Sequence, residues 1–167
     1  MRKTQIAVIG YDNDCTDTAR KLAYEVGKEV ARAGAVLVCG GLGGVMESAC
    51  KGAREGSGIT VGIIPQQEFS YANEYCDIVV CTGIGFSRDF IVSSSADGII
   101  VVGGGVGTLI EMGAAYMMKK TIVAIAGSGG AADSYGNNYL DYRRTVKIML
   151  AKDARSAVRM ITDKLRK

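Results

Sequence analysis

The sequence of 167 residues contains no histidine, no tryptophan and a single proline. Without histidine, the chain cannot build a Ser-His-Asp triad, a Cys-His pair or a histidine-ligated metal site. The five cysteines are an odd number and include no C-x-x-C pair. This usage predicts a reducing, cytoplasmic compartment, no disulfide framework and no metal site.

Long apolar runs are also missing. The first apolar run of the chain, Ile6–Ile9, is too short for the core of a signal peptide. No run approaches the ~20 residues that a membrane-spanning helix needs. We therefore expect no membrane association. Because domains usually have ~100–200 residues, the length predicts a single domain over residues 1–167.

Positive charge gathers at the end of the chain. Residues 143–167 hold nine Lys or Arg against Asp153 and Asp163, a local charge of +7, whereas the whole chain carries +3. A basic segment can contact nucleic acid. This one lacks interleaved aromatic residues and any nucleic-acid motif. We interpret it as the solvated face of a terminal helix and expect no nucleic-acid partner.

Seven short runs rich in Val and Ile predict β-strands. Most are continuous and not alternating, which is typical of strands buried on both faces of a parallel sheet. The predicted strands are Gln5–Ile9, Val36–Cys39, Ile59–Ile64, Ile78–Cys81, Gly98–Val102, Thr121–Ile125 and Val146–Leu150.

Helical patterns alternate with these strands. Apolar residues recur at helical spacing from Ala19 to Ala33, and Gly34 follows as a stop. The remaining predicted helices are Met46–Arg54, Arg88–Ser95, Leu109–Met118 and an amphipathic one from Ala154 to Leu165. Residues 127–141 read as a loop or lid that could select a ligand. The order predicts an α/β fold, a doubly wound, mostly parallel Rossmann-like sheet with helices on both faces.

One motif occurs twice. Residues 40–47 and 104–111 both read G-G-x-G-x-x-x-E, and each follows a strand and opens a helix. Such an elbow exposes backbone N–H groups and the positive end of a helix dipole, which together suit a phosphate. Tight turns alone would also explain the glycines. The candidate ligand-binding residues are Gly40, Gly41, Gly43, Gly44, Gly104, Gly105, Val106, Gly107 and Thr108.

The common nucleotide motifs do not fit these elbows. A P-loop requires Gly-Lys-Ser/Thr, which does not occur. The dinucleotide pattern G-x-G-x-x-G could start at Gly103, but Thr108 stands at its last glycine. Val123 and Ala124 stand where an acidic residue would hold the ribose. The sequence therefore argues against a nicotinamide-dependent dehydrogenase.

Glu111 and Arg88 are the candidate catalytic residues. Thr108-x-x-Glu111 has the form of a capping box, with Thr108 at the N-cap, so Glu111 could be purely structural. A functional Glu111 should face the sugar or base of a ligand, because a phosphate would repel it. Ser87 is the predicted N-cap of the next candidate helix, which puts Arg88 in a first turn where a cation opposes the dipole. A residue whose placement is locally unfavourable often marks a functional site. An ion pair with Asp89 at the surface would also explain this placement of Arg88.

These residues together resemble the signature of the Lonely Guy family, whose members were long mislabelled lysine decarboxylases. Arg88 precedes Glu111 by 23 residues, and Gly103–Glu111 resembles the family's P-G-G-x-G-T-x-x-E motif. Residues 40–46 and 62–65 look like its first elbow and following strand. The resemblance covers roughly residues 5–165.

The resemblance implies a phosphoribohydrolase, which cleaves the N-glycosidic bond of a nucleoside 5′-monophosphate. Glu111 would stabilise or attack the oxocarbenium-like sugar, Arg88 would orient the substrate, and Gly104, Gly105, Gly107 and Thr108 would bind the phosphate. Gly103 replaces the motif's Pro, and Asp89 stands where hydrolases usually have Lys. With these two replacements, the sequence resembles more closely a subgroup of the family that includes a molybdenum-cofactor carrier protein.

Two functions therefore stay open at this point. One is the hydrolase, and the other is a non-catalytic carrier or sensor of a phosphorylated ligand. The ligand would be a nucleoside monophosphate or a phosphorylated pterin, with no further cofactor required. The resemblance also implies a homo-oligomer, dimer or tetramer, with the pocket near a subunit interface. Met112, Tyr116, Met117 and Met118 give one predicted helix more large apolar groups than a single buried face needs.

Overall fold

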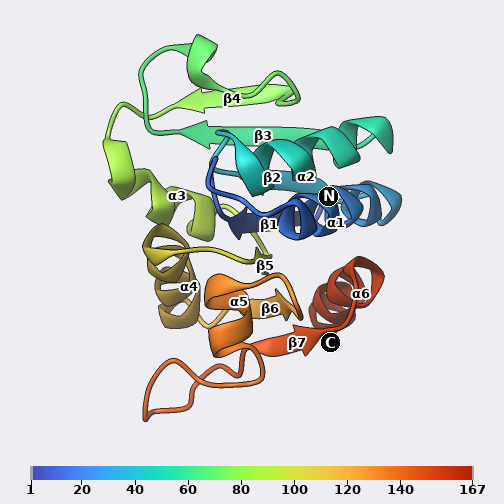
Figure 1. Cartoon of the computed structure of the whole chain (residues 1–167), viewed down its shortest axis with the longest axis vertical. Helices are drawn as coiled ribbons and strands as arrows, with labels where there is room; N and C mark the ends of the chain where they lie inside the picture. Colours follow the sequence, from blue (N-terminus) through green and yellow to red (C-terminus); the bar gives the residue numbers. More distant parts are fainter. Residues whose placement is uncertain (1, 167) are drawn as a thin grey trace.

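The computed structural model describes residues 2–166. Seven parallel strands form one sheet in the order β4-β3-β2-β1-β5-β6-β7 (Figure 1). The chain starts at the centre, builds outward to β4, then crosses over and adds β5 beside β1. The predicted parallel, Rossmann-like sheet is confirmed. The strands are β1 (Gln5–Gly10), β2 (Val36–Cys39), β3 (Ile59–Ile64), β4 (Ile78–Cys81), β5 (Gly98–Val102), β6 (Thr121–Ile125) and β7 (Met149–Ala151).

Helices cover both faces of the sheet. Successive side chains of a strand point to opposite faces, so Ile6 and Val8 of β1 join one core and Ala7 and Ile9 join the other. The first core is closed by α1 (Asp17–Arg32), α2 (Gly44–Glu55) and α6 (Ala154–Leu165). The second is closed by α3 (Arg88–Ser94), α4 (Val106–Met117) and α5 (Gly130–Tyr135).

Two predicted elements need correction near the C-terminus. Residues 127–141 are not an irregular loop throughout, because they contain α5, whose Ala131 and Ala132 are buried in the second core. The predicted strand Val146–Leu150 is displaced to Met149–Ala151. Ile148 bonds instead to Asn137 and Asn138, which holds the residues before β7 outside the sheet.

The ends of two helices also differ from the prediction. Thr108 is not the N-cap of α4. Gly105 is, and Thr108 is the third residue of the helix, within its first turn, so the predicted capping box does not form. Ser87 takes the predicted N-cap position of α3, but it also ends a short 3₁₀ helix, Gly85–Ser87, and its side chain makes no cap bond. Arg88 nevertheless begins α3 as expected.

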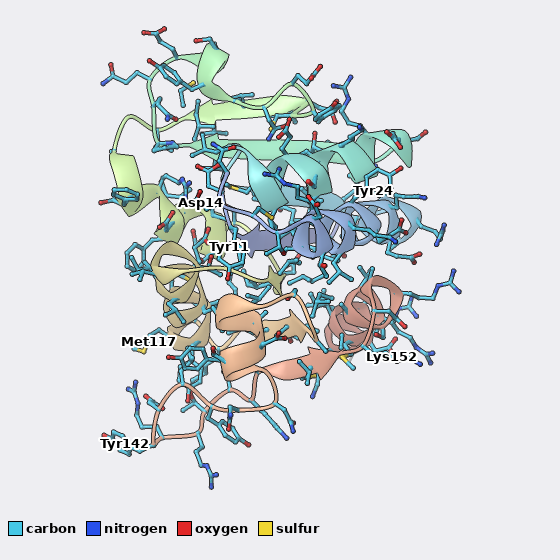
Figure 2. All side chains as sticks on the ribbon, viewed as in Figure 1. Tyr11, Asp14, Tyr24, Met117, Tyr142 and Lys152 are labelled. Atoms are coloured by element: carbon cyan, nitrogen blue, oxygen red, sulfur yellow. The ribbon has the colours of Figure 1, made fainter. Side chains whose placement is uncertain are left out.

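Basic and apolar side chains are exposed at two places on the molecule's surface. Basic side chains of α6, such as Arg155 and Arg159, are exposed while its apolar face packs on the sheet. Met117 and Tyr142 project outward at the edge formed by α4 and the loop before β7 (Figure 2). Among residues 2–166, no helix is long and apolar enough to cross a membrane.

Candidate functional site

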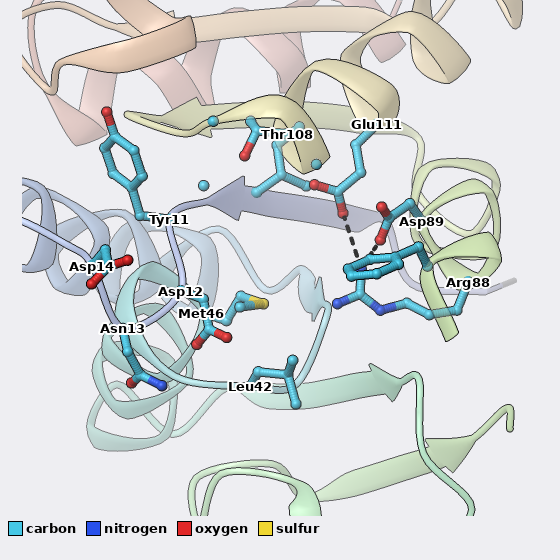
Figure 3. A pocket seen from close by; sticks show the side chains of 15 residues that line it. Tyr11, Asp12, Asn13, Asp14, Leu42, Met46, Arg88, Asp89, Thr108 and Glu111 are labelled. Carbon is cyan, nitrogen blue, oxygen red and sulfur yellow. Dashed lines mark hydrogen bonds and ion pairs between the residues drawn. The ribbon is translucent and has the colours of Figure 1, made fainter. Parts of the chain in front are cut away.

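A hollow of about 400 Å³ opens beyond the carboxyl ends of β1 and β5. The strand order reverses between these two strands, and parallel sheets usually bind their ligands at such a point. Figure 3 shows four segments converging on it: the loop after β1, the first elbow, the start of α3 and the start of α4. Its lining residues are Ile9, Gly10, Tyr11, Asp12, Asn13, Asp14, Leu42, Met46, Phe86, Arg88, Asp89, Gly105, Gly107, Thr108 and Glu111.

The second glycine elbow presents free backbone amides to this hollow. Gly103 and Gly104 have φ values of 62° and 101°, a conformation that favours glycine, and they turn the chain from β5 into α4. No described side chain caps α4. The first helical hydrogen bond there is donated by the Leu109 N–H to Gly105. The amides at the start of α4 are therefore placed to receive an anion, with the helix dipole behind them.

The first elbow is closed by the chain itself. The Gly43 N–H donates to the Asp12 carboxylate over 3.0 Å, and the Val45 N–H donates to the Tyr11 carbonyl over 2.9 Å. A Cβ on Gly44 would lie 2.0 Å from the Asp12 carbonyl oxygen, so only glycine lets the loop after β1 approach so closely. The acceptors that a ligand phosphate would supply are thus already present at this elbow.

Arg88, Asp89 and Glu111 form a buried charged cluster at one side of the hollow. The Arg88 guanidinium donates a hydrogen bond to the Asp89 carboxylate, and its Nη1 lies 3.9 Å from Glu111 Oε1. Burial lowers the pKa of Arg88, and the nearby charge of Glu111 opposes this effect. The buried Arg88 Nε finds no hydrogen-bond partner among residues 2–166. One donor of this buried cation is therefore left unsatisfied within the described chain.

Gly40 contributes to the site by leaving room. A Cβ on Gly40 would lie 2.8 Å from Arg88 Nη2 and 2.8 Å from Met46 Sδ. Real Cβ atoms do not approach other heavy atoms so closely in well-packed interiors. The absence of a side chain at Gly40 therefore allows the guanidinium to lie under the hollow.

Glu111 is held mainly in its neutral form. Burial raises the pKa of its carboxyl group from 4.5 to about 8, and the Arg88 charge only partly opposes this rise. At neutral pH the protonated carboxyl can donate as well as accept a hydrogen bond. It is therefore better suited to positioning a polar ligand group than to stabilising a developing cation.

Acidic groups outnumber basic ones in the lining. Asp12, Asp14, Asp89 and Glu111 face the hollow, and Arg88 is its one basic lining residue in the described chain. The Asp12 and Asp14 carboxylates, which have no basic partner in the lining, repel an anionic ligand. An anionic group would therefore find favourable partners chiefly at the start of α4, while a polar, uncharged ring system could approach the acidic side.

The sequence-predicted residues separate into two groups. Arg88, Glu111, Gly105, Gly107 and Thr108 line the hollow together. The residues Gly40, Gly41, Gly43, Gly44, Gly104 and Val106 do not line it. They lie around it: Val106 is exposed to solvent, Gly104 packs against Thr108, and the first-elbow glycines lie against Arg88, Ile64, Asn13 and Asp12.

The loop after β1 was not among the candidate site residues predicted from the sequence. Its residues Tyr11, Asp12, Asn13 and Asp14 all line the hollow. They carry no glycine fingerprint that would mark them as a binding loop. Only the position of this loop could have indicated a site. It follows the central strand β1, whose carboxyl end lies where the strand order reverses.

Comparison with known proteins places this geometry in context. The fold matches the molybdenum cofactor binding protein of Rippkaea orientalis, with a TM-score of 0.88 and 30% identity over 99% of each chain. It also matches the molybdenum cofactor carrier protein of Chlamydomonas reinhardtii, with a TM-score of 0.86 and 31% identity over 99% of this chain and 100% of that one.

A third similarity is to an enzyme. The chain is 38% identical over 96 residues to the cytokinin riboside 5′-monophosphate phosphoribohydrolase of Mycobacterium tuberculosis, which covers 55% of this chain and 51% of the hydrolase. The matched part is thus about half of that enzyme. Residues 3–158 match the SLOG cluster4 family, which is nearly the whole chain. The chain therefore belongs to the SLOG cluster4 family.

Proposed function

We propose that this protein binds and carries a phosphorylated cofactor of the molybdenum-cofactor type, a pterin with a terminal phosphate, without cleaving it. The phosphate would accept hydrogen bonds from the amides at the start of α4. The polar ring system would lie over the loop after β1. No further cofactor is required, because the bound molecule is the cargo.

The uncapped N-terminus of α4 carries this proposal. It opens into a hollow of about 400 Å³, a size that suits a small ligand. Backbone amides with a helix dipole form a ready anion site. The similarity to two molybdenum-cofactor proteins over the whole chain supports the choice of ligand class.

The state of Glu111 and Arg88 favours carrying over turnover. Glycosidic cleavage builds positive charge on the sugar, which an ionised carboxylate stabilises. Burial keeps Glu111 protonated at neutral pH, and the Asp89 carboxylate compensates the charge of Arg88. In this state the protonated carboxyl can donate a hydrogen bond to a bound ligand, whereas turnover through an ionised Glu111 would require a pH above about 8.

A phosphoribohydrolase is the second candidate. The observation that favours it is the placement of Glu111 and Arg88 beside the proposed phosphate site, 3.9 Å apart, together with the partial similarity to the mycobacterial enzyme. Its substrate would be a nucleoside 5′-monophosphate, cleaved to a free base and ribose 5-phosphate.

The test compares ligand-dependent thermal stability in three proteins. Wild type should melt at a higher temperature with molybdenum cofactor released from a molybdoenzyme, and less so with AMP or inorganic phosphate. Gly105→Glu should abolish the shift, because the new carboxylate would compete for the α4 amides. A Cβ at Gly105 meets no atom within 4 Å, so the variant should fold. Gly113→Ala, also on α4 and equally unobstructed, is the matched control.

Chromatography of the same mixtures separates the two candidates. A carrier returns AMP and the cofactor intact, whereas a hydrolase releases free base that disappears in Glu111→Gln. Base release by wild type above the uncatalysed rate would replace the carrier proposal with the second candidate. Failure of every phosphorylated ligand to change melting would contradict both.

We further infer a homo-oligomer working in a reducing, cytoplasmic compartment. The five free thiols suit such a compartment. Phe90 on α3 and Val106, Ile110 and Met117 on α4 are exposed apolar side chains on neighbouring helices. Exposed apolar groups that gather in this way often mark a protein contact.

A further inference from the structure

Three of the five cysteines meet beneath the first elbow. Cys39 ends β2, Cys50 lies on α2, and Cys76 precedes β4. The Cys39 and Cys50 sulfur atoms lie 3.4 Å apart, and those of Cys50 and Cys76 lie 3.9 Å apart. All three sulfur atoms are within 4.8 Å of one another. Their positions in the sequence, 11 and 26 residues apart, follow no metal-binding motif.

This spacing suits a shared metal ion. Metal–sulfur bonds of ~2.3 Å place the sulfur atoms of a tetrahedral or trigonal site ~3.8–4.0 Å apart. A disulfide would need ~2.05 Å, and the three thiols are free. Small side-chain adjustments would therefore bring all three sulfurs into one coordination sphere.

The backbone around the cluster is arranged to leave the sulfurs room. A Cβ on Gly62 would lie 2.6 Å from Cys76 Sγ, so only glycine at this position of β3 admits that side chain. The Gly41 N–H donates to Cys39 Sγ over 3.3 Å. Such N–H···S bonds are typical supports of thiolate ligands.

Among the described residues, no carboxylate completes the group formed by the three cysteines. The chain has no histidine. The nearest carboxylate in sequence, that of Asp77, already accepts from the N–H and hydroxyl of Thr60 over 2.9 and 3.0 Å. Three sulfurs that are joined by no carboxylate or histidine ligand select thiophilic ions with a filled d shell. A three-coordinate site favours Cu(I) over Zn(II), which prefers four ligands.

We propose that Cys39, Cys50 and Cys76 bind one Cu(I) ion as three thiolates. Three S–H bonds would lose their protons to the solvent, three Cu–S bonds would form, and copper would stay Cu(I) throughout, so no oxidant or reductant is involved. The ion would enter past Cys76, which is only partly buried, whereas Cys39 and Cys50 are buried. This site is separate from the hollow and does not depend on the proposed cargo.

The test is an anaerobic titration of the reduced full chain with Cu(I) against a chromophoric Cu(I) chelator. Wild type should withhold one equivalent of copper from the chelator. Cys76→Ser should lose this equivalent, with affinity reduced at least about tenfold, since replacing even a residue that only supports a ligand costs about 10–100-fold. Cys15→Ser and Cys81→Ser are the matched controls, because these cysteines lie outside the cluster, and both should bind like wild type.

Two further measurements keep the result interpretable. Melting of the metal-free variants shows whether each has folded, and Cys50→Ala provides a second, apolar replacement within the cluster. X-ray absorption at the copper edge should show sulfur neighbours only. Absence of stoichiometric binding, equal binding by folded Cys76→Ser, or binding of Zn(II) in preference to Cu(I) would each overturn the proposal.

Discussion

Arg88 Nη1 lies 3.9 Å from Glu111 Oε1, yet the nearer partner of the guanidinium is the Asp89 carboxylate beside it in the sequence. Three ionisable groups therefore share one buried site. The Asp89 carboxylate offsets the positive charge of Arg88. Little net positive charge therefore remains to stabilise an ionised Glu111. The neutral state of Glu111 follows from this arrangement together with its burial.

The first prediction concerns stability and pH. The pKa of Glu111 is about 8 in the folded protein and 4.5 when unperturbed, so the folded state keeps a proton that the unfolded chain releases between these values. Stability should therefore fall as pH rises through this range, by up to ~1.4 kcal/mol per pH unit. Glu111→Gln should remove this part of the slope. Urea unfolding of both proteins from acid to alkaline pH measures the dependence of unfolding free energy on pH. The same dependence in wild type and Glu111→Gln would refute the raised pKa of Glu111.

The second prediction tests the space beside Arg88. Gly40→Ala places a methyl group 2.8 Å from both Arg88 Nη2 and Met46 Sδ. We expect a loss of ~1–3 kcal/mol in unfolding free energy, as for other overpacked interiors. Ligand affinity should fall as well, because the guanidinium must move. Gly105→Ala, which meets no neighbouring atom, should change stability little. An unchanged Gly40→Ala protein would mean that Arg88 is not fixed by this glycine.

The third prediction concerns the acidic lining. Asp12→Asn keeps an oxygen to accept from the Gly43 N–H but removes one negative charge from the hollow. Binding of inorganic phosphate should strengthen on the order of several-fold at low salt, with little change in stability. Calorimetric titration measures the effect. Asp163→Asn on α6 makes the same change in net charge away from the hollow, and equal gains in both variants would point to a general charge effect.

The fourth prediction concerns thiol reactivity in the metal-free protein. Hydrogen bonds from Cys39 and Cys50 lower the pKa of Cys76 to about 4, while burial raises the pKa of Cys15. Iodoacetamide at about pH 5.5 should therefore label Cys76 before Cys15, because the thiolate is the nucleophile. Peptide mass spectrometry over time identifies the labelled residue. Faster labelling of Cys15 would contradict the prediction.

The fifth prediction concerns assembly. If the apolar surface of Phe90, Val106, Ile110 and Met117 joins two copies, Ile110→Glu should shift the protein to monomers, because it buries a charge at the contact. Light scattering coupled to size-exclusion chromatography measures the mass. Phe69→Glu alters an exposed aromatic near β4 and should leave the mass unchanged. A wild-type monomer at high concentration would remove the basis for the inferred oligomer.

Local sequence patterns predicted those strands and helices well whose burial can be read from their own apolar residues. The runs Val36–Cys39 and Gly98–Val102 match β2 and β5 because buried parallel strands must be continuously apolar. The predicted boundaries were wrong where contacts with residues distant in sequence determine where an element begins. The strand predicted at 146–150 starts later because Asn137 and Asn138 engage Ile148. Thr108 lies inside α4 because the turn at Gly103 and Gly104 lets the helix start earlier.

The sequence by itself determined the doubly wound sheet and the two elbows, since these follow from apolar runs and short motifs, and the placement of Arg88 and Glu111 in one site followed from the family resemblance. Only the tertiary structure decided which elbow is open. The loop after β1 carries no motif, yet its Asp12 carboxylate occupies the first elbow and leaves the second uncapped. The meeting of Cys39, Cys50 and Cys76 was decided in the same way. Proximity of residues from separate strands and helices depends on how the elements pack, and no local spacing encodes it.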